Sequence, residues 1–246
     1  SLLYLLAIFK GTGHLLQMFI DVPYEAGVGL TLLIVVLYTC VGGFVSVVRT
    51  DVMQGLLMLV GSVVIFYFVT RAAGGVASIS RLSALPEKQC LFELNGGIPF
   101  AVLLGVSLSG SLKLLADPRQ LSRFYALKDE AEVLRGKWIA TIGLAIVLGC
   151  LFPVGIYAHL ILTDVTDTDL IVPSLVNDAS VFPLWATDFL VVSILAAAMS
   201  SMDSVLLVAA STLYKNIVAP FRPSSRELLW TRTAVMGFSI VAALLA

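Results

Sequence analysis

Four stretches of the sequence contain no aspartate, glutamate, lysine or arginine and are long enough to cross a lipid bilayer. They are Ala26–Val48, Val52–Thr70, Leu94–Leu112 and Trp138–Thr163. A run of about 18 or more mostly apolar, uncharged residues is typical of a membrane-spanning helix. A membrane β-barrel would instead show alternating segments of about ten residues. The sequence therefore predicts an all-α integral membrane protein that lies in a lipid bilayer.

The composition excludes several other classes of protein. Of the 246 residues, 59% are hydrophobic and only 13% are charged, whereas a soluble domain has roughly 25% charged residues. The net charge is −1 and the basic residues are scattered, so no nucleic-acid surface is expected. Cys40, Cys90 and Cys150 have no metal-binding spacing. His14 and His159 are isolated, and no HExxH, GxSxG or Walker A motif is present, so we expect no enzyme.

Glycine and proline residues divide the sequence into about seven expected transmembrane helices. These helices are placed at 2–20, 26–44, 51–72, 97–116, 137–161, 185–214 and 228–246. The chain starts and ends in apolar runs, at Ser1 and Ala246. We therefore expect residues 1–246 to be a single transmembrane transporter domain that is truncated at both ends.

The distribution of lysine and arginine predicts the orientation of these helices, because cytoplasmic loops carry an excess of both. One side of the membrane would hold ten of them and the other side three. The ten are Arg49, Arg119, Arg123, Lys128, Arg135, Lys137, Lys215, Arg222, Arg226 and Arg232. The three are Arg71, Arg81 and Lys88. The N-terminus of the segment is therefore expected in the cytoplasm, and "TDVTDTDLIVPSLVNDAS" is an acidic outer loop. "DPRQLSRFYALKDEAEVLRG" reads as a cytoplasmic amphipathic helix.

Ionisable residues inside membrane helices are costly and usually face a cavity, a partner or a transport path. Lys10, His14 and Gln17 share one helical face because their spacing is i, i+4, i+7. They line either a solute cavity or an interhelical hydrogen-bonding stripe. Lys113 lies near the end of the fourth helix, with Asp117 one turn later as its local counter-charge. An unpaired ammonium at this level would attract an anionic solute.

The sixth expected helix carries the most informative polar group of residues. Ala197, Ser200, Ser201 and Ser204 form one stripe, and Asp203 shares a face with Ser200. Small residues in a membrane helix often serve close helix packing, which does not explain a carboxylate. Hydroxyls and carboxylates are hard oxygen ligands of the kind that an alkali cation prefers. The stretch therefore predicts an ion site.

Asp51 has two interpretations at the start of the third expected helix. An aspartate there caps free N–H groups, and it can also bind an ion because a carboxylate has several lone pairs. If Asp51 faces Asp203, both cannot stay ionised without a cation or a proton between them. Arg49 is the basic residue nearest in the sequence, and an ion pair with it would remove the need for a cation or a proton between the two carboxylates.

Several of these stretches resemble the sodium/solute symporter family, which carries sugars, proline, pantothenate, acetate and sialic acid. "YTCVGGFVSVVRTDVMQ" resembles its "Y…GG…AV…TD..Q" signature, and "LAAAMSSMDSVLLVAAS" resembles its sodium-site helix. "DPRQLSRFYALKDEAE" resembles its "QRFLAAKS..EA" stretch, although Ser122 replaces the usual Gln. "FKGTGHLLQ" is similar to its "QFKGAG" start, with Ile8 where Gln is common.

The resemblance implies the inverted-repeat, leucine-transporter-like fold, with this chain supplying core helices three to nine of ten. Core helices one, two and ten, which complete the ion and solute sites, are then missing. The resemblance assigns the main sodium site to the Ala197 carbonyl and to the hydroxyls of Ser200 and Ser201. It assigns a second ion site or an exit route to Asp51, Asp203 and Ser204. Asp203 departs from the family's common serine, and Lys113 departs from an aromatic inner gate.

The resemblance implies sodium-coupled symport of a small organic solute, with Na⁺ as the coupling ion, in a plasma or bacterial inner membrane. Two other functions fit the same residues. A symporter-like sensor domain would be fused to a signalling module further along the chain. A facilitator would carry its solute without sodium. The full-length sequence would test the first alternative, and sodium-independent uptake would support the second.

Overall fold

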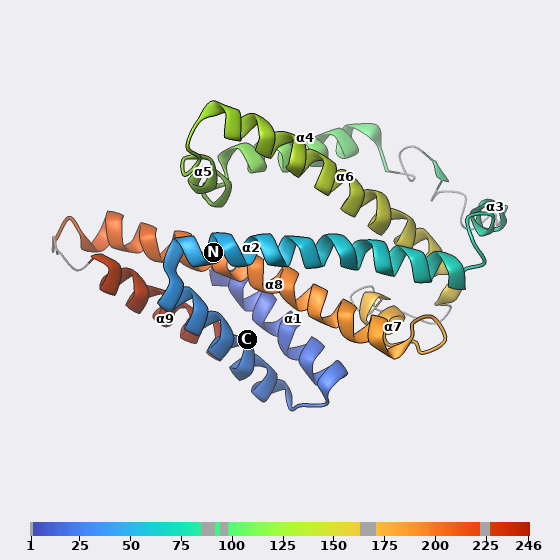
Figure 1. Cartoon of the computed structure of the whole chain (residues 1–246), viewed down its shortest axis with the longest axis horizontal. Coiled ribbons are helices and arrows are strands. Elements are labelled where there is room, and N and C mark those ends of the chain that lie inside the picture. The colour runs from blue at the N-terminus through green and yellow to red at the C-terminus, as the bar shows by residue number, and fades with distance from the viewer. Residues whose placement is uncertain (1, 85–91, 94–97, 163–170, 222–226) are drawn as a thin grey trace. The chain divides into compact units, whose positions relative to one another are not determined.

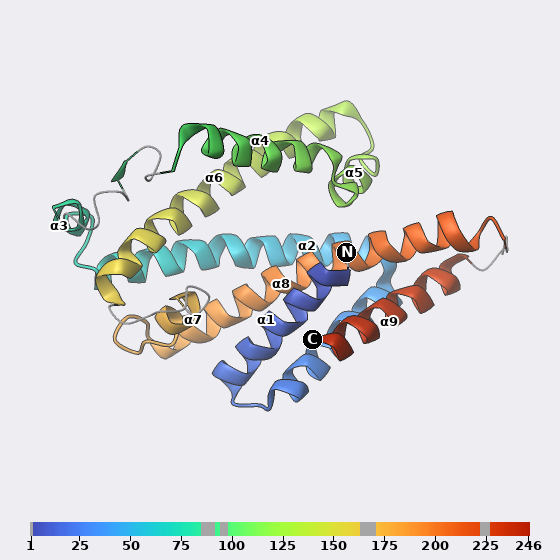
Figure 2. The same cartoon turned by 180° about the vertical axis from the view of Figure 1, so that it is seen from behind.

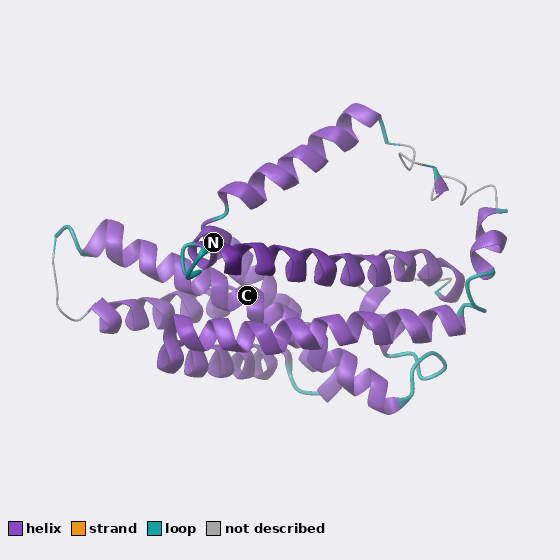
Figure 3. Ribbon diagram, turned by 45° about the horizontal axis from the view of Figure 1, so that its top comes forward, coloured by secondary structure: helices purple, strands orange, loops and turns teal. Residues whose placement is uncertain are grey.

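The computed structural model describes residues 2–84, 92–93, 98–162, 171–221 and 227–246, and these form helices joined by loops (Figures 1 and 3). The helices, in chain order, are α1 (Leu2–Ile20), α2 (Tyr24–Ala72), α3 (Ser78–Ser83), α4 (Phe100–Ala116), α5 (Pro118–Phe124), α6 (Glu130–Ile161), α7 (Ile171–Val176), α8 (Leu184–Leu213), the π-helix η3 (Tyr214–Val218) and α9 (Glu227–Leu245). Lys88, Arg222, Arg226 and residues 163–170 of the expected outer loop lie outside the described residues.

Five helical stretches among the described residues are long and apolar enough to cross a membrane. They are Leu2–Ile20, Gly42–Ala72, Glu130–Ile161, Leu184–Val218 and Glu227–Leu245. The bent pair formed by Phe100–Lys113 and Pro118–Phe124 would make a sixth, and Tyr24–Cys40 is a shorter apolar helix. The all-α membrane architecture expected from the uncharged stretches is therefore confirmed.

The expected break at the glycine pair is present, but the expected loop between this pair and Asp51 is wrong, because α2 (Tyr24–Ala72) consists of two helices that meet at Gly43. The single interruption is at Gly43, with φ 61° and ψ −159°. This backbone conformation is essentially restricted to glycine. One residue is enough to break the helix, and the chain resumes helical geometry before Asp51. Asp51 therefore lies inside a helix, and the capping interpretation of this residue is wrong.

The expected amphipathic helix after α4 is also wrong, because two separate caps divide it. The Asp117 side chain accepts from the Arg119 N–H at 3.0 Å and begins α5, with Pro118 at the first position. α5 ends at Phe124, and the Asp129 side chain then accepts from the Glu132 N–H at 2.9 Å to begin α6. Two aspartates in N-cap positions thus produce two helices.

The chain forms two compact units, and the first comprises Ser1–Met58 and Val191–Ala246. Its core is built by apolar residues from four helices. They are Leu5 and Phe9 of α1, Val28 and Val35 of α2, Met202, Val205, Leu206 and Ala210 of α8, and Val235 and Ala242 of α9. α1 and α9 lie side by side (Figures 1 and 2). At Gly13, an added Cβ would meet Tyr24 and Val28 at 2.7 Å, so glycine permits the close approach of α1 and α2.

The second unit, Leu59–Leu190, contains the end of α2, α3 to α7 and the start of α8. It contains an aromatic group, in which the Phe68 ring lies 5.7 Å from the buried Phe182 and 5.8 Å from the exposed Trp185 between ring centroids. Most large apolar side chains of α4 and α6 are exposed, as expected for helices whose surroundings are apolar.

The backbone at Gly43 gives a first testable prediction. Gly43→Ala should lower the free energy of unfolding by about 1–3 kcal/mol, because alanine is strained at this φ and ψ. Gly29→Ala is the matched control, since Gly29 lies in the same helix with open space around an added Cβ and without positive φ. It should be neutral or stabilising by up to about 1 kcal/mol. Equal thermal unfolding of the two variants in detergent would contradict the prediction.

Candidate functional site

The candidate site lies in the first unit, in the middle of α8. Ala197, Ser200, Ser201 and Ser204 are partly buried, whereas the Asp203 side chain is completely buried, with 0% exposure. Met202, Val205 and Leu206 pack into the apolar core on either side of Asp203. A carboxylate in such surroundings is unfavourable unless hydrogen bonds compensate for the water it has lost.

Two hydroxyls from α2 provide this compensation for Asp203. The Tyr38 hydroxyl donates to Asp203 Oδ2 in a short hydrogen bond, and the Thr39 hydroxyl donates to Asp203 Oδ1 at 3.1 Å. Neighbouring residues of α2 thus engage both oxygens of one carboxylate. Hydrogen bonds to a charged group stabilise by roughly 1.5–3 kcal/mol each.

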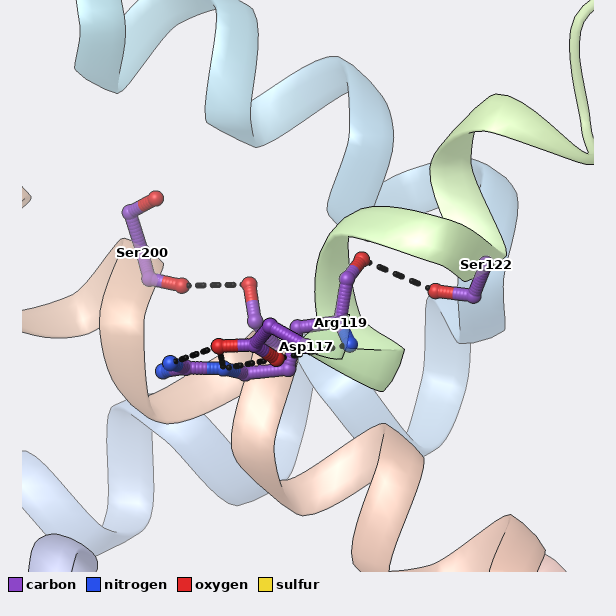
Figure 4. A network of polar contacts seen from close by, with 5 residues as sticks. Asp117, Arg119, Ser122 and Ser200 are labelled. Carbon is purple, nitrogen blue, oxygen red and sulfur yellow. Dashed lines mark hydrogen bonds and ion pairs between the residues drawn. The ribbon is translucent and has the colours of Figure 1, made fainter. Parts of the chain in front are cut away.

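Asp51, the second carboxylate, is bound to α8 by a different hydroxyl. The Ser200 hydroxyl donates to Asp51 Oδ1 at 2.7 Å, and Figure 4 shows the Ser200 side chain directed at this oxygen. Ser200 and Asp203 lie about one turn apart on α8, so the two carboxylates belong to one polar group of side chains, although they accept from different hydroxyls.

The break at Gly43 explains how α2 reaches α8 at both places. In a straight helix, Tyr38 and Asp51 would be about 20 Å apart along the axis, at 1.5 Å per residue. Their partners on α8, Asp203 and Ser200, are only about 4.5 Å apart by the same rule. The change of direction at Gly43 allows both halves of α2 to contact one turn of α8.

The remaining hydroxyls of the stripe differ in their hydrogen bonds. The Ser204 hydroxyl donates to the Ser200 carbonyl at 2.9 Å. The Ser201 hydroxyl has no hydrogen-bond partner among the described residues. A hydroxyl that donates its hydrogen keeps two lone pairs, so each of these oxygens can still bind a cation. The donor set of hydroxyls, carbonyls and carboxylates fits a hard cation such as Na⁺.

The polar stripe of α1 lies away from this group. Lys10, His14 and Gln17 are exposed, whereas the buried face of α1 consists of Leu5, Phe9, Thr12, Gly13 and Leu16. The described contact of the stripe is between the rings of His14 and Tyr24, whose centroids are 4.7 Å apart. The shared face expected from the spacing is present, and it points outward from the first unit.

Lys113 and Asp117 belong to the second unit. Asp117 pairs with Arg119, whose Nη2 lies 2.5 Å from Asp117 Oδ2, and not with Lys113 (Figure 4). The Ser122 hydroxyl, at the position where the usual Gln is replaced, donates to the Arg119 carbonyl at 3.0 Å. Lys113 is exposed in the last turn of α4 and makes no ion pair with a described residue.

Two residues of the polar group were not predicted from the sequence. They are Tyr38 and Thr39. Tyrosine and threonine are ordinary in membrane helices, and nothing in the chain links residues 38 and 39 to residue 203.

Comparison with known proteins identifies several relatives of the chain. The sequence model of the sodium:solute symporter family matches residues 1–246. The sodium/pantothenate symporter of Haemophilus influenzae is 27% identical over 221 residues, which cover 89% of this chain and 45% of the relative. The osmoregulated proline transporter OpuE of Bacillus subtilis is 30% identical, over 95% of this chain and 48% of the relative. This chain thus spans about half the length of these relatives.

A solved structure shows the same fold. The substrate-bound, outward-open structure of a Na⁺-coupled sialic acid symporter superposes with a TM-score of 0.82 at 21% identity, over 98% of this chain and 54% of that chain. The fold is therefore the inverted-repeat, leucine-transporter-like one.

Proposed function

The chain belongs to the sodium:solute symporter family, whose members are integral membrane transporters rather than enzymes, and we propose that it is the central part of a sodium-coupled carrier. The carrier takes up a small organic solute by alternating access, driven by Na⁺ entering down its gradient. The observation that supports this most directly is the hydrogen bond from Ser200 to Asp51, because it joins the hydroxyl stripe of α8 to a carboxylate of α2.

In this proposal, the main sodium site consists of the Ala197 carbonyl and the hydroxyls of Ser200 and Ser201. The Ser201 hydroxyl supports the assignment because it has no hydrogen-bond partner among the described residues, so ion binding breaks no existing bond there. The Ser200 hydroxyl already donates to Asp51, which directs its lone pairs away from that carboxylate and leaves them for the ion.

The main site predicts a specific loss of sodium affinity. In the full-length carrier, Ser200→Ala and Ser201→Ala should each raise the sodium concentration for half-maximal uptake by about 5-fold to 100-fold. A cation that loses one ligand should lose roughly 1–3 kcal/mol, as for a hydrogen bond to a charged group. Ser211→Ala is the control, because this hydroxyl of α8 donates only to the Val208 carbonyl at 3.1 Å. A double variant, Ser200→Ala with Ser201→Ala, whose uptake keeps its sodium dependence would refute the site.

We further propose that Asp51, Asp203 and Ser204 form a second ion site or the route by which sodium leaves inward. The support is that Ser200 is shared. Its hydroxyl contacts Asp51, and its carbonyl accepts from Ser204. A cation released from the main site therefore meets the Asp51 carboxylate next. Asp203 lies about one turn along α8 from Ser200, the partner of Asp51, and two carboxylates at one turn favour a cation near them.

The variant Asp51→Asn tests whether Asp51 acts in the inward release of sodium or in the binding of the solute. The amide keeps an oxygen that accepts from Ser200 but loses the negative charge that draws the ion inward. We expect the maximal uptake rate to fall by about 10-fold or more while the solute concentration for half-maximal uptake changes less than about 3-fold. Uptake rates over a range of solute concentrations measure both quantities. A variant with a normal rate and weakened solute binding would contradict the release role.

We propose that the solute carries a carboxylate and that Lys113, with Asp117 one turn later in the second unit, is part of its path. For the first unit, we propose separately that the α1 stripe of Lys10, His14 and Gln17 lines a solute cavity. The relatives are named for pantothenate and proline, and the structural neighbour for sialic acid. Each of these compounds bears a carboxylate. In the second unit, Arg119 engages Asp117, so the Lys113 charge is not used in that ion pair.

Lys113→Gln tests the solute class. It should reduce uptake of organic anions by about 10-fold or more, since a charged contact to a carboxylate is lost, and it should spare neutral solutes. A panel of radiolabelled anionic, zwitterionic and neutral compounds supplies the measurement, with Lys137→Gln as the control because Lys137 lies over the Trp138 ring in α6. Transport of an uncharged sugar alone by the unaltered carrier would refute the idea.

We also propose that residues 1–246 act as a single transport domain together with core helices one, two and ten of the family's fold. The support is that the chain spans about half the length of its relatives. The carrier lies in a plasma or bacterial inner membrane, with the start of α1 on the cytoplasmic side. The excess of lysine and arginine at Arg49 within α2 and in the segments after α4 and α8 supports this orientation.

A further inference from the structure

An apolar cavity of about 180 Å³ lies between η3 and α9. These two elements pack against each other within the first unit. The described lining comes from the end of α8, from η3 and from one face of α9, and consists of Leu213, Tyr214, Val218, Trp230, Thr233 and Ala234. None of these residues belongs to the candidate ion site, so the cavity is a separate feature of the same unit.

One wall of the cavity departs from regular α-helix. The Ala219 N–H donates to the Tyr214 carbonyl at 2.8 Å, which is the i→i+5 hydrogen bond of a π-helix. This single turn supplies two of the lining residues, Tyr214 and Val218. Short π-helical turns are rare and are frequently found at functional sites. The cavity therefore coincides with an irregularity of the kind that often accompanies a binding site.

The chemistry of the lining favours an apolar occupant. Leu213, Val218 and Ala234 have no polar side-chain atom, and the Thr233 hydroxyl donates to the Trp230 carbonyl at 2.9 Å within α9. A buried water needs two to four polar partners, and a polar solute needs several convergent polar groups. Neither would be well satisfied here, whereas a hydrocarbon chain needs no such partner.

The cavity reaches the surface of the unit at the level where two membrane helices end. The Trp230 side chain is 40% exposed and Thr233 is exposed, whereas Tyr214 is buried. η3 ends the apolar stretch Leu184–Val218, and α9 begins the stretch Glu227–Leu245. Tryptophan and tyrosine are enriched at this depth, where lipid chains meet their headgroups. The neighbour available to the cavity is therefore membrane lipid.

The charged residues around the lining are mainly basic. Lys215 follows Tyr214 in the sequence, Arg232 precedes Thr233, and Glu227 is three positions before Trp230. Lys215 is exposed and makes no ion pair with a described residue. In the orientation proposed above, this end of the helices faces the cytoplasm, where anionic lipid headgroups attract lysine and arginine. The charge therefore complements a phospholipid with a negative headgroup.

We propose that the cavity between η3 and α9 binds an acyl chain of an anionic phospholipid, and that Lys215 binds the phosphate of its headgroup. This site goes beyond sodium coupling and depends only on the proposed membrane orientation. The bound lipid would contact both η3 and α9. It would stabilise their packing, because a ligand that binds only the folded state shifts unfolding by mass action.

Native mass spectrometry of the purified full-length carrier tests the site with dioleoyl phosphatidylglycerol, and with dioleoyl phosphatidylcholine for comparison. Thr233→Phe places a ring in the cavity and should weaken binding of the tightest phosphatidylglycerol by about 10-fold or more, since buried methylene groups are displaced. Lys215→Gln should weaken it by about 5-fold and leave phosphatidylcholine nearly unchanged, since one charge near the headgroup is lost.

The matched controls are Thr231→Phe, the same change at a residue of α9 outside the lining, and Lys137→Gln in the second unit. Both should bind phosphatidylglycerol within about 2-fold of the unaltered carrier, because neither residue lines the cavity. Equal binding of the two lipids by the unaltered carrier would overturn the proposal. Equal effects of Thr233→Phe and Thr231→Phe would overturn it as well.

Trp230 reports directly on the location of the acyl chain, because bromine atoms on a chain quench the fluorescence of an indole ring that they contact. In detergent, with about one brominated phosphatidylglycerol per carrier, the unaltered protein should lose fluorescence that Trp230→Phe does not lose. Brominated phosphatidylcholine should quench less. Equal quenching of the two proteins would refute the site, as expected if another helix of the longer chain fills the cavity. This measurement decides the matter if Thr233→Phe does not fold, and neither result bears on sodium coupling.

Discussion

The buried carboxylate of Asp203 is the constraint on which the arrangement of the first unit depends. It has 0% exposure and lies in a helix face whose neighbours, Met202, Val205 and Leu206, are core residues. A charge there is tolerable only if hydrogen bonds replace water. Tyr38 and Thr39 supply two, and this requires the first half of α2 to pack against the middle of α8. The apolar core formed with α1 and α9 is built around the same contact.

The glycine break in α2 separates two polar attachments of this helix to α8. Tyr38 and Thr39 bind α8 before Gly43, whereas Asp51 binds it afterwards. The two halves of α2 are thus attached to one turn of α8 by separate polar contacts, with a non-helical residue between them. A cation at the proposed second ion site would draw on Asp51, which belongs to the second attachment. A change there can alter the angle at Gly43, which is the kind of local rearrangement that hinge motions use.

The membrane helices could be predicted from the sequence because the absence of charge over some 20 residues admits few alternatives. The helical stretch at residues 45–50 was not predicted, since a glycine pair followed by Asp51 resembles a helix end and a new cap. Ser200 and Asp51 could be selected as candidates because polar groups in apolar helices are costly. Ser200 and Asp51, which contact each other, are separated by 149 positions in the sequence. Tyr38 and Asp203 are separated by 165 positions. Such contacts depend on how α2 and α8 cross, which periodicity within one helix does not specify. The α1 stripe shows the same limit, since its spacing predicts a shared face but not the neighbour that face meets.

Ser200 connects the proposed main site to the carboxylate of Asp51, so ion binding at this site affects Asp51. Its hydroxyl donates to Asp51 through the hydrogen while its oxygen lone pairs remain for an ion. A cation at those lone pairs withdraws electron density from the O–H bond and strengthens its hydrogen bond to Asp51, as linked hydrogen bonds polarise one another. By thermodynamic reciprocity, the negative charge of Asp51 must strengthen the binding of that cation to the same extent. The hydrogen bond therefore stabilises the loaded state of the main site, and a second cation that neutralises Asp51 weakens it. In the proposed cycle, occupation beside Asp51 thus favours inward release of the first ion.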